Sequence, residues 1–304
     1  MVKLKKSTSS SHPFILLFIS ILSVSISSIM IKFSDTPTSV AGMYRLFISV
    51  IILLAFIPWK MLRTVVMNKK EWGIVVLAGV SLGLHFLFWM ESLVFTSVAS
   101  SMVILSLQPL FVMIGSYFLF KERASLLTVF CLIAALFGSI IIACGDIGIS
   151  KKALIGDGLS LLGTLFVSAY LLAGQKVSRK LDANVYSTIV FFIGGTVMLV
   201  YNLFNHYSLI DYDSSDWTYF LLLAIIPTIF GQYIFNLLLK SIGATTVSVG
   251  IIGEPVLAII LAFLLLGETI TFFQLLGGMI TLFGMGMYFW SKSLIGGMKV
   301  GNNR

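Results

Sequence analysis

Apolar residues occur along the chain in long runs that short polar stretches interrupt at regular intervals. A helix of about 20 apolar residues spans the hydrocarbon core of a bilayer, so each run of that length is a candidate span. Ten such runs are present, at residues 14–34, 40–59, 72–94, 97–120, 124–144, 156–176, 184–205, 217–239, 243–267 and 271–290. The pattern predicts an all-α polytopic membrane protein with ten transmembrane helices and no sizeable soluble domain.

Composition and charge support this fold class. Hydrophobic residues make up 58% of the chain and charged residues 11%, whereas soluble domains average about 25% charged residues. The net charge of +8 does not indicate a nucleic-acid partner, because the basic residues lie in short gaps between apolar runs rather than on a soluble face. The expected partner of the chain is therefore a lipid bilayer.

The placement of lysine and arginine predicts the orientation. When the gaps are assigned alternately to two sides of a membrane, one side receives only Lys32, Lys151 and Lys152. Arg45 lies within a span, and the rest of the 20 basic residues share the opposite side. Because basic loops stay on the cytoplasmic side, this asymmetry predicts that both termini are cytoplasmic and that the protein lies in the cytoplasmic membrane.

An internal repeat divides the chain. The stretch that begins at Ser106 aligns without a gap with the stretch that begins at Ile252, at a constant offset of 146 residues. The offset pairs Gln108 with Glu254, Pro109 with Pro255, Glu122 with Glu268 and Gly138 with Gly284. We therefore predict two five-helix repeats, residues 1–147 and 148–304, within one integral membrane unit. Since five is odd, the second half crosses the membrane in the opposite direction, which makes the repeat an inverted one.

Two polar residues fall near the middle of this repeat. Gln108 and Glu254 lie about halfway along the fourth and ninth spans, near the midplane where inverted-repeat transporters place their substrate sites. Pro109 and Pro255 are predicted helix breaks, because each lacks a backbone donor. Two interpretations of Glu254 stay open: a protonated carboxyl bonded across a helix contact, or a cavity group that binds a cation or exchanges a proton.

Other polar residues within the spans are further site candidates. Arg45 and Glu91 lie at matching depths in their spans. They could form a structural pair, or the arginine could snorkel to the interface. Alternatively, they could hold a substrate carboxylate or gate the outer mouth. Gln232 and Asn236 share one helix face, and their amides suit either a cavity or interhelical hydrogen bonds. His85 and Trp89 share another face, where packing is the simpler role for the histidine.

Small residues within two spans are interpreted as packing positions. Serines such as Ser20 and Ser27 in the first span, and glycines such as Gly277, Gly284 and Gly286 in the tenth, allow close helix approach. The glycine-rich stretch of the tenth span is not a nucleotide loop, because it has no preceding strand and no following lysine. No cofactor and no metal site is expected.

These features together resemble a known family. The proline-containing spans that close on "FLFKE" and "LLLGE", the "YRLFIS" of the second span and the "SLVFTSVASSMVILSLQP" that bridges the third and fourth resemble EamA-type transporters of the drug/metabolite transporter superfamily. Glu91 departs from the family pattern, which has a small residue there. The resemblance implies a carrier of amino acids, other metabolites or drugs, working mostly as an exporter or a facilitator.

The sequence therefore predicts a secondary transporter that moves small metabolites, such as amino acids or similar amphipathic compounds, outward by alternating access. Protons are a candidate coupling ion. An importer, an uncoupled facilitator and a nucleotide-sugar-like carrier remain alternatives. A membrane enzyme would need paired carboxylates or a histidine cluster, and a receptor would need a signalling domain; the sequence displays neither. The oligomeric state is left open.

Overall fold

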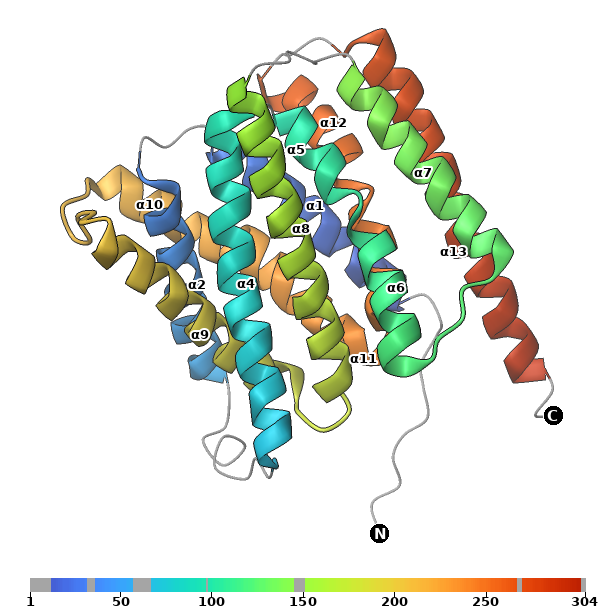
Figure 1. Cartoon of the computed structure of the whole chain (residues 1–304), viewed down its shortest axis with the longest axis horizontal. Helices are drawn as coiled ribbons and strands as arrows, with labels where there is room; N and C mark the ends of the chain where they lie inside the picture. The colour runs from blue at the N-terminus through green and yellow to red at the C-terminus, as the bar shows by residue number, and fades with distance from the viewer. Residues whose placement is uncertain are drawn as a thin grey trace.

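The computed structural model describes residues 12–31, 36–56, 67–96, 98–144, 151–266 and 270–301, and the elements in these ranges are all helices (Figure 1). Their bounds are α1 (His12–Ile31), α2 (Thr38–Phe56), α4 (Lys69–Phe95), α5 (Val98–Leu105), α6 (Gln108–Phe120), α7 (Leu126–Cys144), α8 (Lys151–Val177), α9 (Ala183–Phe204), α10 (Ser214–Leu223), η1 (Ala224–Tyr233), α11 (Ile234–Ile251), α12 (Glu254–Leu266) and α13 (Phe272–Gly301). The prediction of an all-α fold is confirmed.

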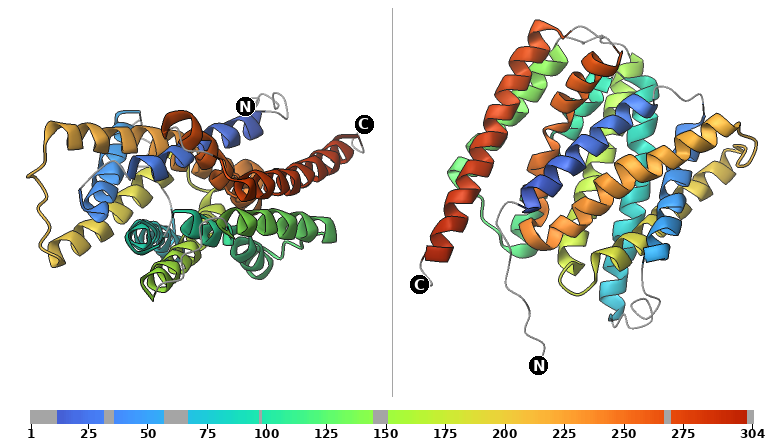
Figure 2. Two further views of the ribbon diagram at one scale, coloured as in Figure 1. Left: turned by 90° about the horizontal axis from the view of Figure 1, so that it is seen from above. Right: turned by 180° about the vertical axis from the view of Figure 1, so that it is seen from behind.

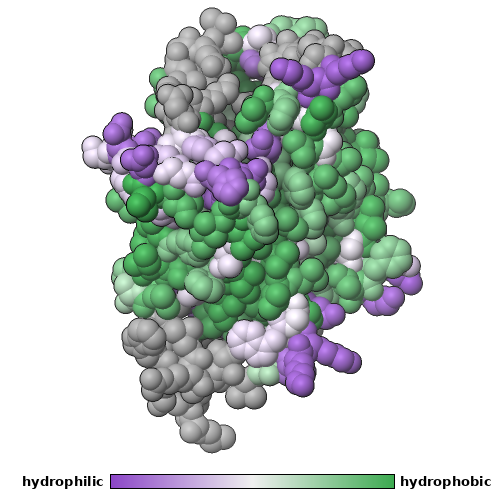
Figure 3. All heavy atoms as spheres, turned by 60° about the vertical axis from the view of Figure 1, so that its left-hand side comes forward, coloured by the Kyte–Doolittle hydropathy of each residue, from purple (hydrophilic) through white to green (hydrophobic). Residues whose placement is uncertain are grey.

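The helices match the predicted spans in number, although not all of them in length. Within the described ranges, seven helical stretches are long and apolar enough to cross a membrane, and three shorter apolar helices complete the set of ten. Exposed side chains such as Ile51, Phe118 and Leu264 are apolar, and about two thirds of each remains accessible. Figure 3 shows these apolar residues as a broad middle zone with hydrophilic residues toward the two ends, the distribution that a bilayer requires.

The structure corrects the predicted spans at three places, where one run of apolar residues contains more than one helix. The fourth span breaks between α5 and α6, and the ninth breaks between α11 and α12. In the eighth span, α10 passes into the π-helical segment η1 before α11 begins. An apolar run reports only that a segment lies in lipid, so a break that stays buried leaves no gap in the pattern.

A kink at Gly243 separates the eighth span from the ninth inside α11. Gly243 has φ +77° and ψ 164°, a conformation that essentially only glycine adopts. The helix that restarts after it has a free N–H at Ala244, which donates to Oε1 of Gln175 at 2.5 Å. Gln175 in turn donates through Nε2 to Glu122 at 3.0 Å, so one side chain of α8 holds the ends of two other helices.

The helix ends repeat at the offset that the sequence predicts. Adding 146 to the bounds of α5 gives Ala244–Ile251, the part of α11 after the kink, and adding 146 to the bounds of α6 gives those of α12. The internal repeat is therefore present in the backbone as well as in the sequence. Glu268, the predicted counterpart of Glu122, lies outside the described residues. The boundary at residue 147 and the orientation of the termini stay predictions.

The first helix of each half packs against the other half. α1 contacts η1, α11 and α12, while α8 contacts α4, α5 and α6. Figure 2 shows α1 beside α11 on one side of the bundle and α4 beside α8 on the other. The contacts of α2 with α9 and of α7 with α13 also join the two halves. The predicted repeats are thus interleaved in space, although they are consecutive in sequence.

Glycines bring α7 and α13 together. A Cβ built on Gly138 would lie 2.5 Å from the backbone nitrogen of Thr281, and one built on Gly277 would lie 2.5 Å from the carbonyl oxygen of Gly138. At Gly284 it would lie 2.7 Å from the nitrogen of Ala135. Close helix approach is confirmed for these positions, whereas a Cβ on Gly286 would meet nothing within 4 Å.

Candidate functional site

A pocket lies inside the bundle, at the two repeat-related helix breaks, and is called the cavity below. Leu105 and Gln108 line it from the break between α5 and α6, and their repeat counterparts Ile251 and Glu254 line it from the break between α11 and α12. The remaining lining residues are Val24, Ser27, Arg45, His85, Phe86, Trp89, Val167, Gln232 and Phe235. Eight helices and η1 therefore contribute to one partly polar space.

Most of the predicted site residues meet in this cavity. Of the eight candidates, the structure brings together Arg45, His85, Trp89, Gln108, Gln232 and Glu254. Glu91 and Asn236 do not line the cavity. The six residues come from five helical elements in both halves of the chain, so their meeting is a property of the tertiary structure.

The helix break explains how a glutamate and a proline are accommodated in an apolar run. Glu254 is the first residue of α12 and Pro255 the second. A carboxylate at a helix N-terminus faces the positive end of the helix dipole, and a proline in the first turn forfeits no intrahelical hydrogen bond. Gln108 and Pro109 occupy the same positions in α6. The breaks therefore precede the prolines, which begin new helices rather than kink existing ones.

Arg45 is held from several sides. Its side chain is 1% exposed. Nε donates to Oγ1 of Thr228 at 2.9 Å, and Nη1 donates to Oγ of Ser27 at 3.4 Å. The guanidinium carbon lies 4.3 Å from the ring centroid of Phe86, in a cation–π arrangement. The positive charge is thus fixed against one wall of the cavity.

Glu91 does not pair with Arg45. Of the described residues, the only ion pair joins Lys180 and Glu71, and Arg45 instead bonds to α1 and η1. Glu91 follows Trp89 by two residues, which rotates it roughly 200° around α4, away from the face that lines the cavity. It interacts electrostatically with Tyr201 of α9. Arg45 and Glu91 therefore lie at similar depths in the membrane, but their side chains point in different directions.

Arg45 and Glu254 interact electrostatically within the cavity without forming a direct ion pair. Glu254 is 7% exposed, and its backbone carbonyl accepts a hydrogen bond from Oγ of Ser25 at 3.3 Å. Opposite charges that share a buried cavity offset part of each other's desolvation cost. A ligand that separates the two charges would find a partner for each sign.

His85 and Trp89 form a rigid stacked pair. Nδ1 of His85 lies 2.9 Å from the carbonyl oxygen of Gly163, and because a carbonyl only accepts, Nδ1 carries the proton. The imidazole and indole rings stack with centroids 6.0 Å apart at 12°. The indole Nε1 of Trp89 has no hydrogen-bond partner in the part of the chain that the structure describes.

The two amides of the eighth span have different environments. Gln232, in η1, lines the cavity. Asn236 accepts from the hydroxyl of Tyr170 and donates to Oγ of Ser187 at 3.0 Å, in a buried network between α8, α9 and α11. The side chain of Asn236 therefore serves interhelical hydrogen bonding, whereas Gln232 lines the cavity.

Sequence reasoning missed three residues that shape the site. Thr228 and Phe86 were not singled out, and Ser27 was interpreted as a packing serine. The oxygen of Thr228 both accepts from Arg45 and donates to the carbonyl of Leu223, five residues earlier, at 2.9 Å. A signal was available, because Pro227 lies inside a predicted span and proline interrupts helical hydrogen bonding.

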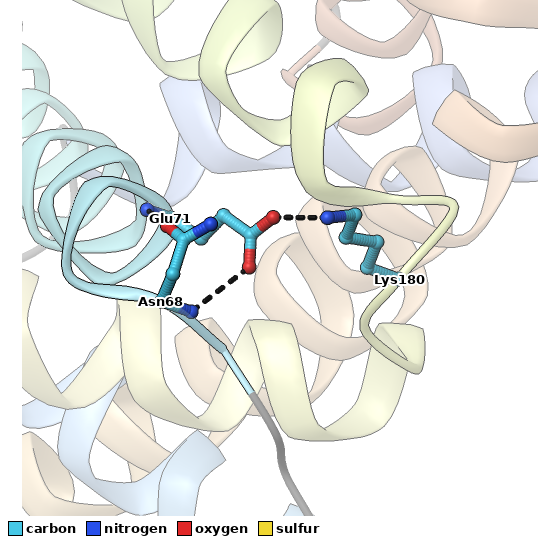
Figure 4. A network of polar contacts seen from close by, with 3 residues as sticks. All are labelled: Asn68, Glu71 and Lys180. Carbon is cyan, nitrogen blue, oxygen red and sulfur yellow. Dashed lines mark hydrogen bonds and ion pairs between the residues drawn. The ribbon is translucent and has the colours of Figure 1, made fainter.

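A second polar cluster lies at the N-terminus of α4 (Figure 4). Asn68 and Glu71 form a capping box, with the N–H of Glu71 donating to Asn68 at 2.9 Å and the N–H of Asn68 donating to Glu71 at 3.1 Å. Lys180, from the connection between α8 and α9, pairs with the same carboxylate. The lysine side chain is 60% exposed, so the pair ties two helix ends together but adds little stability.

A helical bundle with an apolar belt and a partly polar cavity at paired helix breaks is the architecture of a membrane transporter. The chain belongs to the EamA-like transporter family, whose model matches residues 13–144 and 154–290, and hence to the drug/metabolite transporter superfamily. The two matched segments confirm the internal repeat. The protein is a multi-pass membrane transporter rather than an enzyme.

Two relatives are themselves described only as transporters. The chain is 24% identical over 250 residues to an uncharacterized transporter of Archaeoglobus fulgidus, covering 80% of this chain and 84% of that one. It is 27% identical over 194 residues to the uncharacterized transporter YetK of Bacillus subtilis, covering 60% of this chain and 57% of that one. Neither description includes a substrate.

The fold has a counterpart among solved structures. A crystal structure with 17% sequence identity superposes with a TM-score of 0.77, covering 92% of this chain and 96% of that chain. At this identity the likeness concerns the fold alone.

Proposed function

We propose that the protein is a secondary transporter that carries small amphipathic metabolites, such as amino acids, outward across the cytoplasmic membrane by alternating access. The observation that carries this proposal is the cavity at the two repeat-related helix breaks, which holds Arg45 and Glu254 with opposite charges. A buried site with both signs suits a molecule that itself carries both, because neither charge is then left unpaired in the low-dielectric interior.

Alternating access follows from the repeat. Two halves that cross the membrane in opposite directions, residues 1–147 and 148–304, would expose the central cavity first to one side and then to the other by exchanging conformations. The distribution of lysine and arginine supports cytoplasmic termini. The outward direction rests on the resemblance to exporters. Glu254 is the candidate proton carrier, because it is the carboxylate of the cavity.

The test is transport by the purified chain in proteoliposomes. Vesicles are loaded with amino acids or with other small amphipathic metabolites, and efflux is followed with and without an imposed pH gradient. Efflux of one compound class that responds to the gradient supports a proton-coupled transporter. Efflux that ignores the gradient identifies an uncoupled facilitator. Net accumulation inside right-side-out vesicles would identify an importer, and no flux of any compound would overturn the proposed substrate class.

A further inference from the structure

Two buried N–H donors of the cavity have no acceptor. Four buried side-chain polar atoms among the described residues lack a hydrogen-bond partner: Nε1 of Trp89, Nε2 of Gln108, the hydroxyl of Tyr186 and Oδ1 of Asn202. Only Trp89 and Gln108 line the cavity, and their side chains are 4% and 1% exposed. A buried donor without an acceptor is costly, so two in one cavity indicate that an acceptor arrives with the ligand.

Neither donor is free to turn toward an acceptor elsewhere. The indole of Trp89 is stacked on His85, which is itself bonded to the carbonyl of Gly163. Glycine at position 163 lets α8 approach α4 closely, because a Cβ there would lie 3.2 Å from the backbone nitrogen of Trp89. Gln108 is the first residue of α6 and is almost fully enclosed. Both donors are therefore preorganised.

A positive charge stands in the same cavity. Arg45 is fixed there by Thr228 and Ser27 and by the ring of Phe86. One cation with two neutral N–H donors matches a group that carries a single negative charge and several acceptor lone pairs. A carboxylate has this chemistry. A phosphate carries roughly 1.5 to 2 negative charges at pH 7, which a single arginine beside Glu254 would leave uncompensated.

We infer that Arg45, Trp89 and Gln108 form a carboxylate-binding subsite, in which the two N–H donors select substrates that bear a carboxylate. This inference rests on the proposed transport function and deepens it. Glu254, in the same cavity, would then bind a cationic group of the same substrate molecule or a proton. Trp89 and Gln108 come from the first half, as does Arg45, so one half supplies the carboxylate partners and the other supplies Glu254.

The first arm of the test uses the wild-type chain in proteoliposomes. Efflux of L-leucine is compared with that of leucinamide and isopentylamine, which lack the carboxylate, and of 4-methylpentanoate, which lacks the amine. We expect the KM for efflux of the two carboxylates to be at least tenfold lower than that of the two compounds without one. If compounds without a carboxylate are transported equally well, the subsite is wrong while the transport function stands. If no compound in the wider metabolite panel is transported, both fail.

The second arm uses matched variants of the full-length chain. Trp89→Phe and Gln108→Met remove the N–H donors while keeping an aromatic ring or a side chain of similar length. We expect each to raise the KM for carboxylate substrates by about tenfold or more, as loss of a hydrogen bond to a charged group does, with a change under threefold for the amide analogue. Trp72→Phe, at an exposed position, serves as the matched control for the aromatic change.

An equal loss for carboxylate and amide substrates would show that Trp89 and Gln108 only maintain the shape of the cavity, which overturns the inference. Thermal unfolding of each variant in detergent separates this outcome from misfolding. If one variant does not fold, the other variant and the wild-type comparison still decide the question.

Discussion

Oγ1 of Thr281 donates a hydrogen bond of 3.3 Å to the carbonyl of Ala135, and the two residues are 146 positions apart, the offset of the internal repeat. Residues that are equivalent in the two halves therefore contact each other. Close contacts around them occur in equivalent pairs. Gly138 contacts Gly277, and Gly284, the counterpart of Gly138, contacts Cys131, the counterpart of Gly277. Self-complementary contacts of this kind surround a two-fold axis, and α7 and α13 cross near it.

This packing leaves no room for a side chain. We predict that Gly138→Val lowers the stability of the protein by about 1 to 3 kcal/mol, because the added atoms would overlap the backbone of α13. Gly286→Val is the control, since a Cβ there meets nothing within 4 Å. Thermal unfolding in detergent measures both. Equal unfolding temperatures for the two variants would contradict the close α7–α13 contact.

Thr228 positions Arg45 and is expected to act through it. Thr228→Val removes the acceptor of the Arg45 Nε–H, and leaves that donor buried. We predict an increase of roughly tenfold in the KM for the transported compound, as the loss of a hydrogen bond to a charged group implies. Thr228→Ser keeps the oxygen and should restore the KM. Efflux at varied substrate concentration measures it, and failure of serine to rescue would assign the effect to packing.

The Tyr170–Asn236 pair should affect stability without affecting transport affinity. Tyr170→Phe leaves Oδ1 of Asn236 buried without its donor, which costs about 1 to 3 kcal/mol. Neither residue lines the cavity, so the KM should not change. Tyr117→Phe, on the exposed surface of α6, is the control. A changed KM at normal stability would mean that the network reaches the substrate after all.

Glu254 and Glu91 provide a matched test of proton coupling. If Glu254 carries the proton, Glu254→Gln should retain substrate exchange and lose the dependence of efflux on a pH gradient. Glu91→Gln removes a carboxylate that lies outside the cavity and should leave that dependence intact. Efflux from proteoliposomes with and without the gradient measures both variants. Coupling that survives in Glu254→Gln would exclude this residue as the proton carrier.

The orientation can be tested at two exposed loop positions. In a chain with Cys131→Ser and Cys144→Ser, we predict that a cysteine at Asp211 reacts with a membrane-impermeant maleimide in intact cells. A cysteine at Lys180 should react only after the membrane is permeabilised, because the lysine and arginine distribution predicts that this loop is cytoplasmic. Labelling with the opposite pattern would reverse the orientation of the whole chain.

Much of this protein could be predicted from its sequence, because the relevant signals are linear. The length of an apolar run is enough to identify a span, and a constant offset is enough to identify a repeat. The depths of Gln108 and Glu254 follow from counting residues along a span, and both reach the cavity. The positions of the two breaks followed from their prolines, although the role of each proline, at the start of a helix, did not.

Tertiary structure decided which polar side chains meet. Arg45 and Glu91 have similar depths, but direction around a helix depends on phase and on which helix lies alongside, and Arg45 meets Thr228 of η1 instead. Gln232 lines the cavity, whereas Asn236, four residues later, bonds to Tyr170 and Ser187 of neighbouring helices, which residue spacing alone does not reveal. The interleaving of α1 and α8 between the halves arises likewise from packing between distant segments. The sequence by itself thus determined the spans, the repeat and the depth of each polar group. Only the folded bundle determined the partners of those groups, because a partner depends on the direction of a side chain around its helix and on which helix packs alongside, rather than on position along the chain.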